Sequence, residues 1–112
     1  MYQIFGIPNC NTVKKALTHL DKSGAKYEFI NFKKQAPTKE LLRNWKDAFG
    51  DWPVNKRGPT YRKIKDEFEA ASTPDKYKIL IETTSAIKRP VIMKGNKVMG
   101  FGYDEETYSN IK

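Results

Sequence analysis

Cysteine, histidine and long apolar runs are all scarce in this sequence. Cys10 is the only cysteine among 112 residues, so an internal disulfide is excluded and nothing favours an oxidising compartment. Apolar runs such as Ile79-Leu80-Ile81 are far too short to span a bilayer. The first residues also lack the basic and long apolar segments of a secretory signal. We therefore expect a cytoplasmic protein without membrane association.

The scarcity of histidine argues against a metal centre. His19 is the single histidine, and one imidazole cannot build a metal site alone. It follows polar Thr18 on the predicted outer side of the first helix, so we expect it to face solvent. The acidic groups 66–69 and 104–106 show no spacing typical of an acid/base pair. We expect neither a metal ion nor a nucleotide cofactor.

Positive charge, in contrast, is abundant. Lysine and arginine number 21 against 13 acidic residues, which gives a net charge of +8 and an isoelectric point near 9.6. Such an excess favours anionic partners, namely oxyanions, glutathione, nucleic acid or an acidic protein surface. Many of the lysines are scattered along the chain, and for these solubility is an equally good explanation.

The apolar pattern predicts one α/β domain. Alternating or short apolar runs predict strands at 2–5, 27–32, 91–93 and from Val98 onward, and 94–97 is predicted to form a hairpin turn. Helical spacing appears after Cys10, and Ser23-Gly24 is a helix stop. The acidic residues Asp104, Glu105 and Glu106 are expected to cap a short terminal helix. The predicted order is βαβ, a helical insertion, then ββα.

The insertion is predicted to contain several helices. Thr38 is expected to cap the first one, whose apolar face would carry Leu41, Trp45, Ala48 and Phe49. Thr73 is expected to cap the last one, with Pro74 at its first helical position. The mixture of aromatic and basic residues around Trp45, Trp52, Arg57, Tyr61 and Arg62 is compatible with nucleic-acid binding. Because Trp45 and Tyr61 fall on apolar helix faces, core packing is the better interpretation.

The stretch from Tyr2 to Leu20 contains the strongest candidate for chemistry. A predicted strand, a Gly6–Asn9 break, Cys10 and a helical pattern follow one another. This order places the sulfur at a helix N-terminus, where the helix dipole favours a thiolate. A lone cysteine is most often an inert, buried apolar residue. Here, however, its neighbours are of loop, capping and cationic types, which favours a reactive thiol; they are Asn9, Asn11, Thr12, Lys14 and Lys15.

Two further features qualify this prediction. Val13 stands where a second cysteine would complete a dithiol pair, so any disulfide formed during turnover must be with another molecule. Arg89 and Pro90 precede a predicted strand, where a proline is normally trans and an arginine is ordinarily a surface charge.

Three motifs are separated along the chain but keep a definite order. They are Gly6-Ile7-x-Asn9-Cys10-x-Thr12-x-Lys14-Lys15-Ala16, Arg57-Gly58-x-Thr60-Tyr61-Arg62-Lys63 and Ile87-Lys88-Arg89-Pro90. Together they resemble the ArsC/Spx superfamily. The chain looks most like the YffB branch of small arsenate-reductase-like proteins. The resemblance implies a thioredoxin-like fold with a mixed four-stranded sheet. A single domain 1–112 would combine a core of about 1–32 and 87–112 with a helical insertion of about 33–86.

The resemblance also implies a set of site residues. Cys10 would be the nucleophile, Arg89 the guanidinium beside the anion, and Arg57 a basic residue presented by the insertion. Pro90 would follow a cis peptide bond. The expected substrate-binding residues are Asn9, Asn11, Thr12 and Pro90.

The sequence departs from its relatives in two respects. Arsenate reductases of this family place arginines at three sites around the oxyanion, whereas residues 100–104 offer no arginine here and the insertion aligns Asn55, with Arg57 two residues away. Arginine supplies the bidentate donation that an arsenate dianion needs, so the loss weakens that function. The missing second cysteine likewise removes the intramolecular redox switch of the Spx branch.

These observations predict a thiol-dependent reductase with one nucleophilic cysteine and glutathione as co-substrate. One alternative is arsenate reductase proper, coupled to glutathione and glutaredoxin. Another is an Spx-like regulatory protein that binds the α subunit of RNA polymerase. The expected small-molecule partner is glutathione or an oxyanion, and we expect a monomer.

Overall fold

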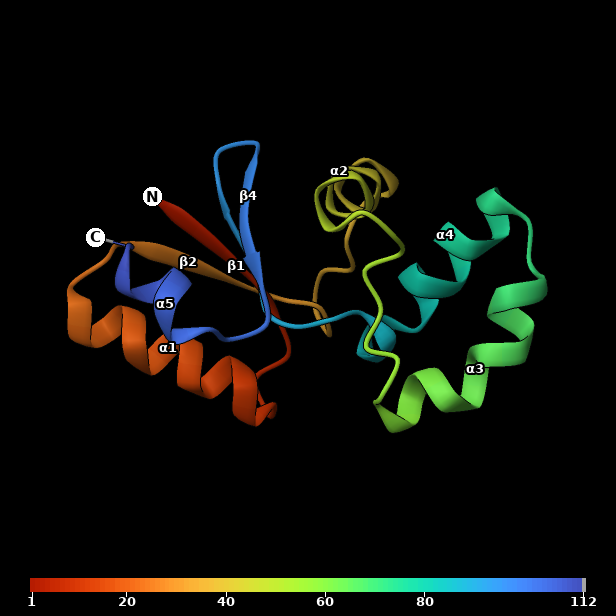
Figure 1. The fold of residues 1–112 in the computed structure, drawn as a ribbon, viewed down its shortest axis with the longest axis horizontal. Helices are drawn as coiled ribbons and strands as arrows, with labels where there is room; N and C mark the ends of the chain where they lie inside the picture. Colours follow the sequence, from red (N-terminus) through yellow and green to blue (C-terminus); the bar gives the residue numbers. More distant parts are fainter. Residues whose placement is uncertain (112) are drawn as a thin grey trace. The chain divides into compact units, whose positions relative to one another are not determined.

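The computed structural model describes residues 1–111, which separate into two compact units (Figure 1). Met1–Gln35 and the segment from Arg89 onward form the first, which we call the sheet unit. Ala36–Lys88 forms the second, which we call the helical unit. The sheet unit is therefore built from two segments that are distant in sequence.

The sheet unit contains a four-stranded mixed sheet in the order β2-β1-β3-β4. Its strands are β1 (Tyr2–Gly6), β2 (Tyr27–Asn31), β3 (Val91–Lys94) and β4 (Lys97–Phe101). Strand β1 pairs parallel with β2 and antiparallel with β3, and β3 pairs antiparallel with β4. This arrangement confirms the predicted α/β sheet, although β4 begins at Lys97, which had been predicted to lie in the turn.

Two helices cover one face of this sheet, α1 (Asn11–Ser23) and α5 (Glu105–Ser109). Alternate residues of β1 and β3 meet the apolar side of both helices, because successive strand residues point to opposite faces. Gly24 ends α1 with φ of 74°, a left-handed conformation that suits glycine and confirms the predicted stop. The buried core comprises Tyr2, Ile4, Ala16, Leu20, Ile92, Tyr108 and Ile111.

The prediction that His19 faces solvent is wrong. Its ring is half-buried between the two helices, with Nδ1 3.1 Å from the hydroxyl of Tyr103. The ring also packs against Tyr103 and Tyr108, with centroid distances of 5.9 and 5.8 Å. The polar character of Thr18 therefore did not indicate the environment of the next residue, because α5 covers that side of α1.

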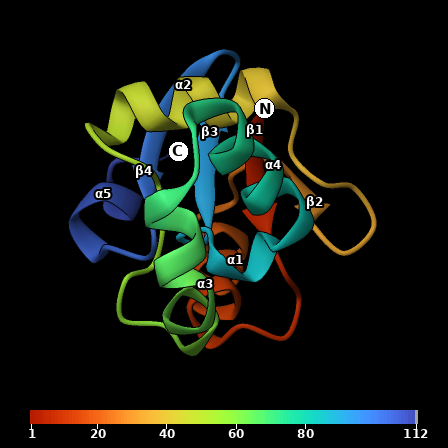
Figure 2. The same cartoon turned by 90° about the vertical axis from the view of Figure 1, so that its right-hand side faces the viewer.

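The helical unit contains α2 (Lys39–Phe49), α3 (Pro59–Ala70), α4 (Thr73–Glu82) and a 3-10 turn at Thr84–Ala86 (Figures 1 and 2). A short antiparallel bridge joins Val54 to Ile87, near the segments where the chain enters and leaves the α3–α4 pair. Trp45 and Tyr61 are buried, which confirms that they pack in the core. None of the helices described combines the length and the apolar character that crossing a bilayer requires.

Two details of this unit differ from the sequence prediction. The buried side of α2 is formed by Leu42 and Trp45, whereas Ala48 is exposed and Phe49 is 40% exposed. Ser72 caps α4, not Thr73, because its hydroxyl oxygen accepts the N–H of Asp75 at 3.4 Å. Thr38 caps α2 as predicted and accepts the N–H of Leu41 at 3.1 Å.

Candidate active site

Cys10 occupies the N-cap position of α1. Its extended backbone (φ −104°, ψ 125°) connects the loop after β1 to the first helical residue, Asn11. Its side chain has no oxygen atom to cap the helix, and the first turn of α1 carries no acidic side chain. The positive end of this helix is thus left open to an anion at the position of the half-buried sulfur.

The surroundings of the sulfur favour its ionised form. Burial raises the pKa of the Cys10 thiol, because it removes water from a charge. Hydrogen bonds from the N–H of Val13, the Arg89 guanidinium and the N–H of Thr12 act in the opposite direction, as does the Arg89 charge. The net effect is a pKa below its ordinary value. The charged group that lowers this pKa is Arg89, and not Lys14 or Lys15 as the sequence suggested.

Arg89 and Cys10 are brought together by the pairing of β1 with β3. Arg89 precedes β3, and the Arg89–Pro90 peptide bond is cis, as the resemblance implied. The carbonyl of Pro90 accepts the N–H of Gly102 at 2.8 Å, which joins this segment to the residue after β4. The guanidinium is therefore positioned by the sheet, since Arg89 adjoins its third strand.

Gly6 allows β1, α1 and Arg89 to approach closely. A Cβ atom at this position would lie 2.8 Å from Cγ2 of Val13 and 3.9 Å from Cβ of Arg89. The first of these distances is shorter than a carbon–carbon contact allows. The sequence indicated Gly6 only as a break after a strand, and its role in packing depends on a contact that local patterns do not show.

The remaining predicted residues lie in different places. Asn9 and Asn11 are exposed on either side of Cys10, and Thr12 contributes its N–H to the sulfur. Arg57 belongs to the helical unit, where it is exposed and lines a hollow of about 340 Å³ together with Asn55, Lys56 and Lys88. Its participation in the chemistry of Cys10 stays a prediction.

This arrangement provides one activated sulfur nucleophile. The donors that lower its pKa also make it a better leaving group in a disulfide. Because Cys10 is the only cysteine, a partner sulfur has to come from another molecule. Across residues 1–111, no cluster of three or more His, Cys, Asp or Glu side chains is arranged to hold a metal ion.

Solved structures with this fold support a thiol-based assignment. A YffB protein superposes with a TM-score of 0.87 at 32% identity, covering 99% of this chain and 98% of its own. A possible arsenate reductase from Streptococcus mutans gives 0.76 at 30% identity, covering 92% and 91%. A glutaredoxin from Archaeoglobus fulgidus gives 0.52 at 19% identity, covering 98% and 83%. This last likeness concerns the fold alone, and it supports the thioredoxin-like assignment.

Comparison of sequences gives relatives of the same kind as comparison of structures. An uncharacterized protein of Haemophilus influenzae is 30% identical over 96% of both chains. The global transcriptional regulator Spx of Staphylococcus aureus is 26% identical over 95% of this chain and 82% of its own. The model of the ArsC family matches residues 5–111. The chain belongs to the ArsC family.

Proposed function

We propose that this protein is a glutathione-dependent thiol–disulfide reductase in which Cys10 is the single nucleophile. The observation that supports this most directly is the lowered pKa of Cys10, which follows from the N–H groups of Val13 and Thr12 and the guanidinium of Arg89. Membership of the ArsC family agrees with thiol-based reduction. Glutathione is anionic at neutral pH, so a cationic site favours it over a neutral thiol.

The proposed reaction has two exchange steps. The Cys10 thiolate attacks the glutathione sulfur of a mixed disulfide; a bond forms between these two sulfurs, the original S–S bond breaks, and the substrate leaves as a thiolate that takes a proton from water. A second glutathione thiolate then attacks the glutathione sulfur held on Cys10. This step releases glutathione disulfide and restores the Cys10 thiolate. Overall, the substrate sulfur of the mixed disulfide is reduced to a thiol and the sulfur of the second glutathione is oxidised into glutathione disulfide.

Each predicted site residue has a place in this proposal. Arg89 stabilises the thiolate and faces the carboxylates of glutathione, and Arg57 supplies a second cation. Asn9, Asn11, Thr12 and Pro90 present amide, hydroxyl or backbone groups to the bound peptide. We also propose that the protein acts as a monomer in the cytoplasm, a compartment in which thiols are kept reduced.

The pH dependence of Cys10 alkylation tests the activated thiolate. We expect a thiol pKa below the ordinary value of about 8.5. Arg89→Gln removes both a hydrogen bond and a charge, so it should raise the pKa and slow alkylation at pH 7. Arg43→Gln, at an exposed position of α2, serves as the matched control and should change neither. A wild-type pKa at or above about 8.5 would contradict the proposal.

Arsenate reduction is a second candidate, because a relative at 30% identity is described as a possible arsenate reductase. Residues 100–104 supply no arginine, however, and Tyr103 of this segment contacts His19 instead. Arsenate-dependent oxidation of glutathione in the presence of glutaredoxin, lost in Cys10→Ser, would support arsenate as the substrate. Absence of turnover in that assay would exclude it.

A regulatory function is the third candidate, because Spx is 26% identical over most of the chain. The resemblance to the Spx branch implies binding to the α subunit of RNA polymerase. Capture of that subunit by both the wild type and Cys10→Ser would favour a binding protein. Failure of both to capture it would argue against this function.

A further inference from the structure

A second surface feature lies beside the candidate active site and is not used by the reaction above. It is a hollow of about 640 Å³ between α1 and the beginning of α5. We call it the α1–α5 groove, and its volume lies within the range of ligand-binding clefts. The residues that carry the argument are Lys14, Lys15, His19, Lys22, Tyr103 and Glu105.

The floor of the groove is fixed by buried aromatic packing. His19 contacts the hydroxyl of Tyr103 through Nδ1 at 3.1 Å. Tyr103 packs against Tyr108 with ring centroids 5.0 Å apart, and Tyr108 is 1% exposed in the core of the sheet unit. A ligand would therefore find this surface largely preformed, which lowers the entropic cost of binding.

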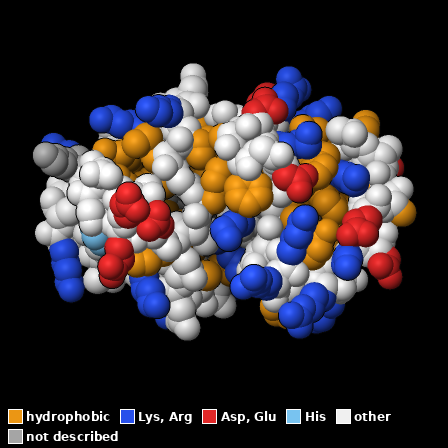
Figure 3. All heavy atoms as spheres, in the orientation of Figure 1, with side chains coloured by type: hydrophobic (Ala, Val, Ile, Leu, Met, Phe, Trp, Pro, Cys, Tyr) orange, Lys and Arg blue, Asp and Glu red, His pale blue; other side chains and the backbone are white. Residues whose placement is uncertain are grey.

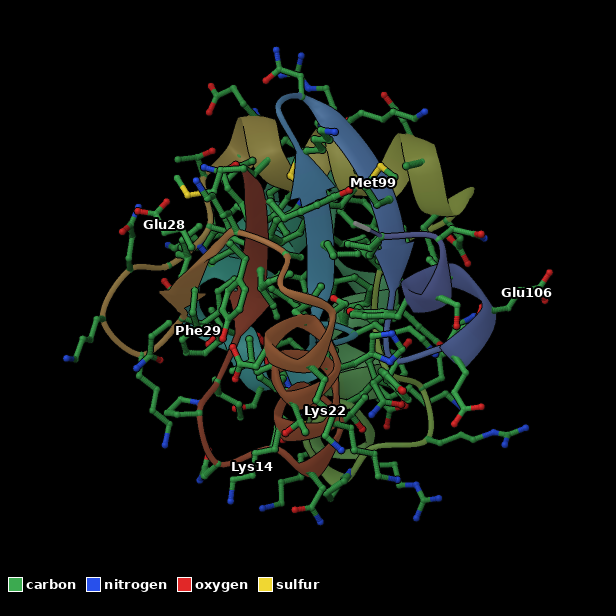
Figure 4. All side chains as sticks on the ribbon, turned by 90° about the vertical axis from the view of Figure 1, so that its left-hand side faces the viewer. Lys14, Lys22, Glu28, Phe29, Met99 and Glu106 are labelled. Atoms are coloured by element: carbon green, nitrogen blue, oxygen red, sulfur yellow. The ribbon has the colours of Figure 1, made fainter. Side chains whose placement is uncertain are left out.

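The two walls of the groove carry opposite charge. Lys14, Lys15 and Lys22 are exposed on α1, whereas Glu105 lies on α5. Figure 3 shows basic side chains over α1 and acidic ones over α5, and Figure 4 shows Lys14 and Lys22 on the outer side of α1. Lys15 and Lys22 are seven positions apart and thus lie on one side of the helix, about 10 Å from each other along its axis.

We propose that the α1–α5 groove binds an acidic segment of a partner protein. In an extended chain, residues two or four apart project to the same side and are roughly 7 or 13 Å from each other. These spacings bracket the separation of Lys15 and Lys22, so two carboxylates of one segment can reach both ammonium groups. Binding along α1 provides carboxylate partners for lysines that are exposed on the helix.

The acidic wall favours a protein segment over a nucleic acid. A phosphate backbone carries uniform negative charge, which Glu105 and the neighbouring Asp104 and Glu106 would repel. A protein segment can place carboxylates over α1 and a neutral or basic residue near Glu105. The charge asymmetry of the groove therefore matches a chain of mixed sequence.

The position of the groove gives binding a consequence for Cys10. The groove starts at Asn11, the residue that follows the sulfur-bearing Cys10. A segment that carries a glutathione mixed disulfide and acidic residues nearby would be held with its sulfur close to Cys10, which raises the effective concentration of the reacting groups. This part of the inference rests on the proposed reductase function, whereas binding of the segment does not.

Binding is measured first, with a labelled acidic peptide that contains no cysteine, by fluorescence anisotropy. Lys15→Glu/Lys22→Glu should weaken binding about tenfold, because two attractive pairs become repulsive. The matched control is Lys33→Glu/Lys34→Glu, which changes net charge equally at exposed positions of the sheet unit outside the groove. This control should change affinity by no more than about twofold, as expected for distant screened charges.

Removal of a negative charge from α5 tests the acidic wall of the groove. If the test peptide is acidic throughout and so has no neutral or basic residue to place near Glu105, Glu105→Gln should strengthen its binding by about twofold, because it removes one repulsion. Glu28→Gln, at an exposed position of β2, is its matched control and should have no effect. Circular dichroism of all four variants verifies that each remains folded. Equal weakening in both lysine variants would show diffuse charge attraction and overturn the proposal.

A single-stranded oligonucleotide serves as the competing occupant. The oligonucleotide could bind more tightly than the peptide and lose affinity in Lys15→Glu/Lys22→Glu but not in Lys33→Glu/Lys34→Glu. That result would show that the groove binds nucleic acid and not an acidic protein segment, and it would overturn the proposal. Weaker binding than the acidic peptide supports a protein segment.

Exchange kinetics separate this proposal from the proposed function. Two glutathionylated peptides, one acidic and one neutral, are compared as substrates. Faster reaction of the acidic one, with the preference lost in Lys15→Glu/Lys22→Glu, supports docking at the groove. If neither peptide reacts while the cysteine-free peptide still binds, the reductase function fails and the docking site stands. If both react equally and the cysteine-free peptide does not bind, the docking site fails and the function stands.

Discussion

Helices α1 and α4 begin in opposite ways. At α4, the hydroxyl of Ser72 accepts the N–H of Asp75, and the Asp75 carboxylate places a negative charge in the first turn. At α1, the same capping position holds Cys10, which has no side-chain oxygen to cap the helix, and the first turn has no acidic residue. The N–H groups at the start of α4 are therefore satisfied by side chains of that helix start, whereas those at the start of α1 are available to an ionised sulfur.

This difference links stability to reactivity. An uncapped helix N-terminus leaves N–H groups that an anion can satisfy. Ionisation of Cys10 supplies that anion, with donors from Val13, Thr12 and Arg89. The free energy that lowers the thiol pKa is therefore also free energy that stabilises the folded chain when the sulfur is charged. Helices α2 and α5 resemble α4 in this respect, because Thr38 and Asp104 cap them with oxygen atoms.

The largest expected effect comes from making the two helix starts alike. Cys10→Ser should abolish thiol–disulfide exchange, because no sulfur remains to form the intermediate. It should change the free energy of unfolding at neutral pH by less than about 1 kcal/mol, because the capping that serine provides is offset by the loss of the bonds that Val13, Thr12 and Arg89 make to the thiolate. Turnover and urea unfolding measure the two effects. A folded Cys10→Ser that still exchanges disulfides would show that Cys10 is not the nucleophile.

The next effect tests how the start of α1 is held near Arg89. Gly6→Ala should lower the free energy of unfolding by about 1–3 kcal/mol, because the new methyl group overlaps Val13. Gly6→Ala/Val13→Ala should be less destabilised than the sum of its two single variants, since the second change removes the overlapping atoms. Urea unfolding of the three variants measures this coupling. Strict additivity would mean that the contact does not limit packing.

A smaller effect compares the two caps directly. Ser72→Ala should cost about 1 kcal/mol, because the N–H of Asp75 loses its acceptor. At a pH below the measured pKa of Cys10, where the thiol is protonated, Cys10→Ala should cost less than about 0.5 kcal/mol, because the side chain has no oxygen atom to cap α1. Chemical unfolding of both variants at that pH measures the difference. Equal losses would show that the thiol caps α1 as an oxygen does.

The smallest effect is a pH dependence. The folded chain holds the Cys10 pKa below that of the unfolded chain, about 8.5, so the unfolded chain binds more protons between these two values. Wild-type stability relative to Cys10→Ser should therefore rise with pH through that window and level off above it. Water screens the charge on the half-buried sulfur, so the rise in the free energy of unfolding should be small. A difference that falls with rising pH would reverse the proposed linkage.

Periodic patterns predicted the elements better than the contacts between them. Strand and helix types, the caps at Thr38 and Asp104 and the stop at Gly24 follow from neighbouring residues, and the structure agrees. Ser72 was missed because Ser72 and Thr73 are adjacent residues of similar capping preference, and Pro74 is tolerated at either position of the first turn. Local sequence does not distinguish the two.

The site was predictable only where its chemistry is local. The position of Cys10 at a helix start follows from the residues on both sides of it. The hydrogen bond from Arg89 to the sulfur does not, because it depends on the pairing of β1 with β3, and only the family resemblance indicated it. His19 was assigned to solvent for the same reason, since α5 lies far from α1 in sequence. Long-range packing decides both environments.

The two-segment construction of the sheet unit has a consequence during protein synthesis. Strand β1 emerges early and can pair with β2, but its other neighbour, β3, and the adjoining Arg89 are made much later. At usual translation rates, roughly 4 to 16 s separate the appearance of Cys10 from that of Arg89. Throughout that interval the nascent thiol lacks its guanidinium partner. Premature reaction of the sulfur with cellular disulfides is thereby slowed until translation has passed Arg89.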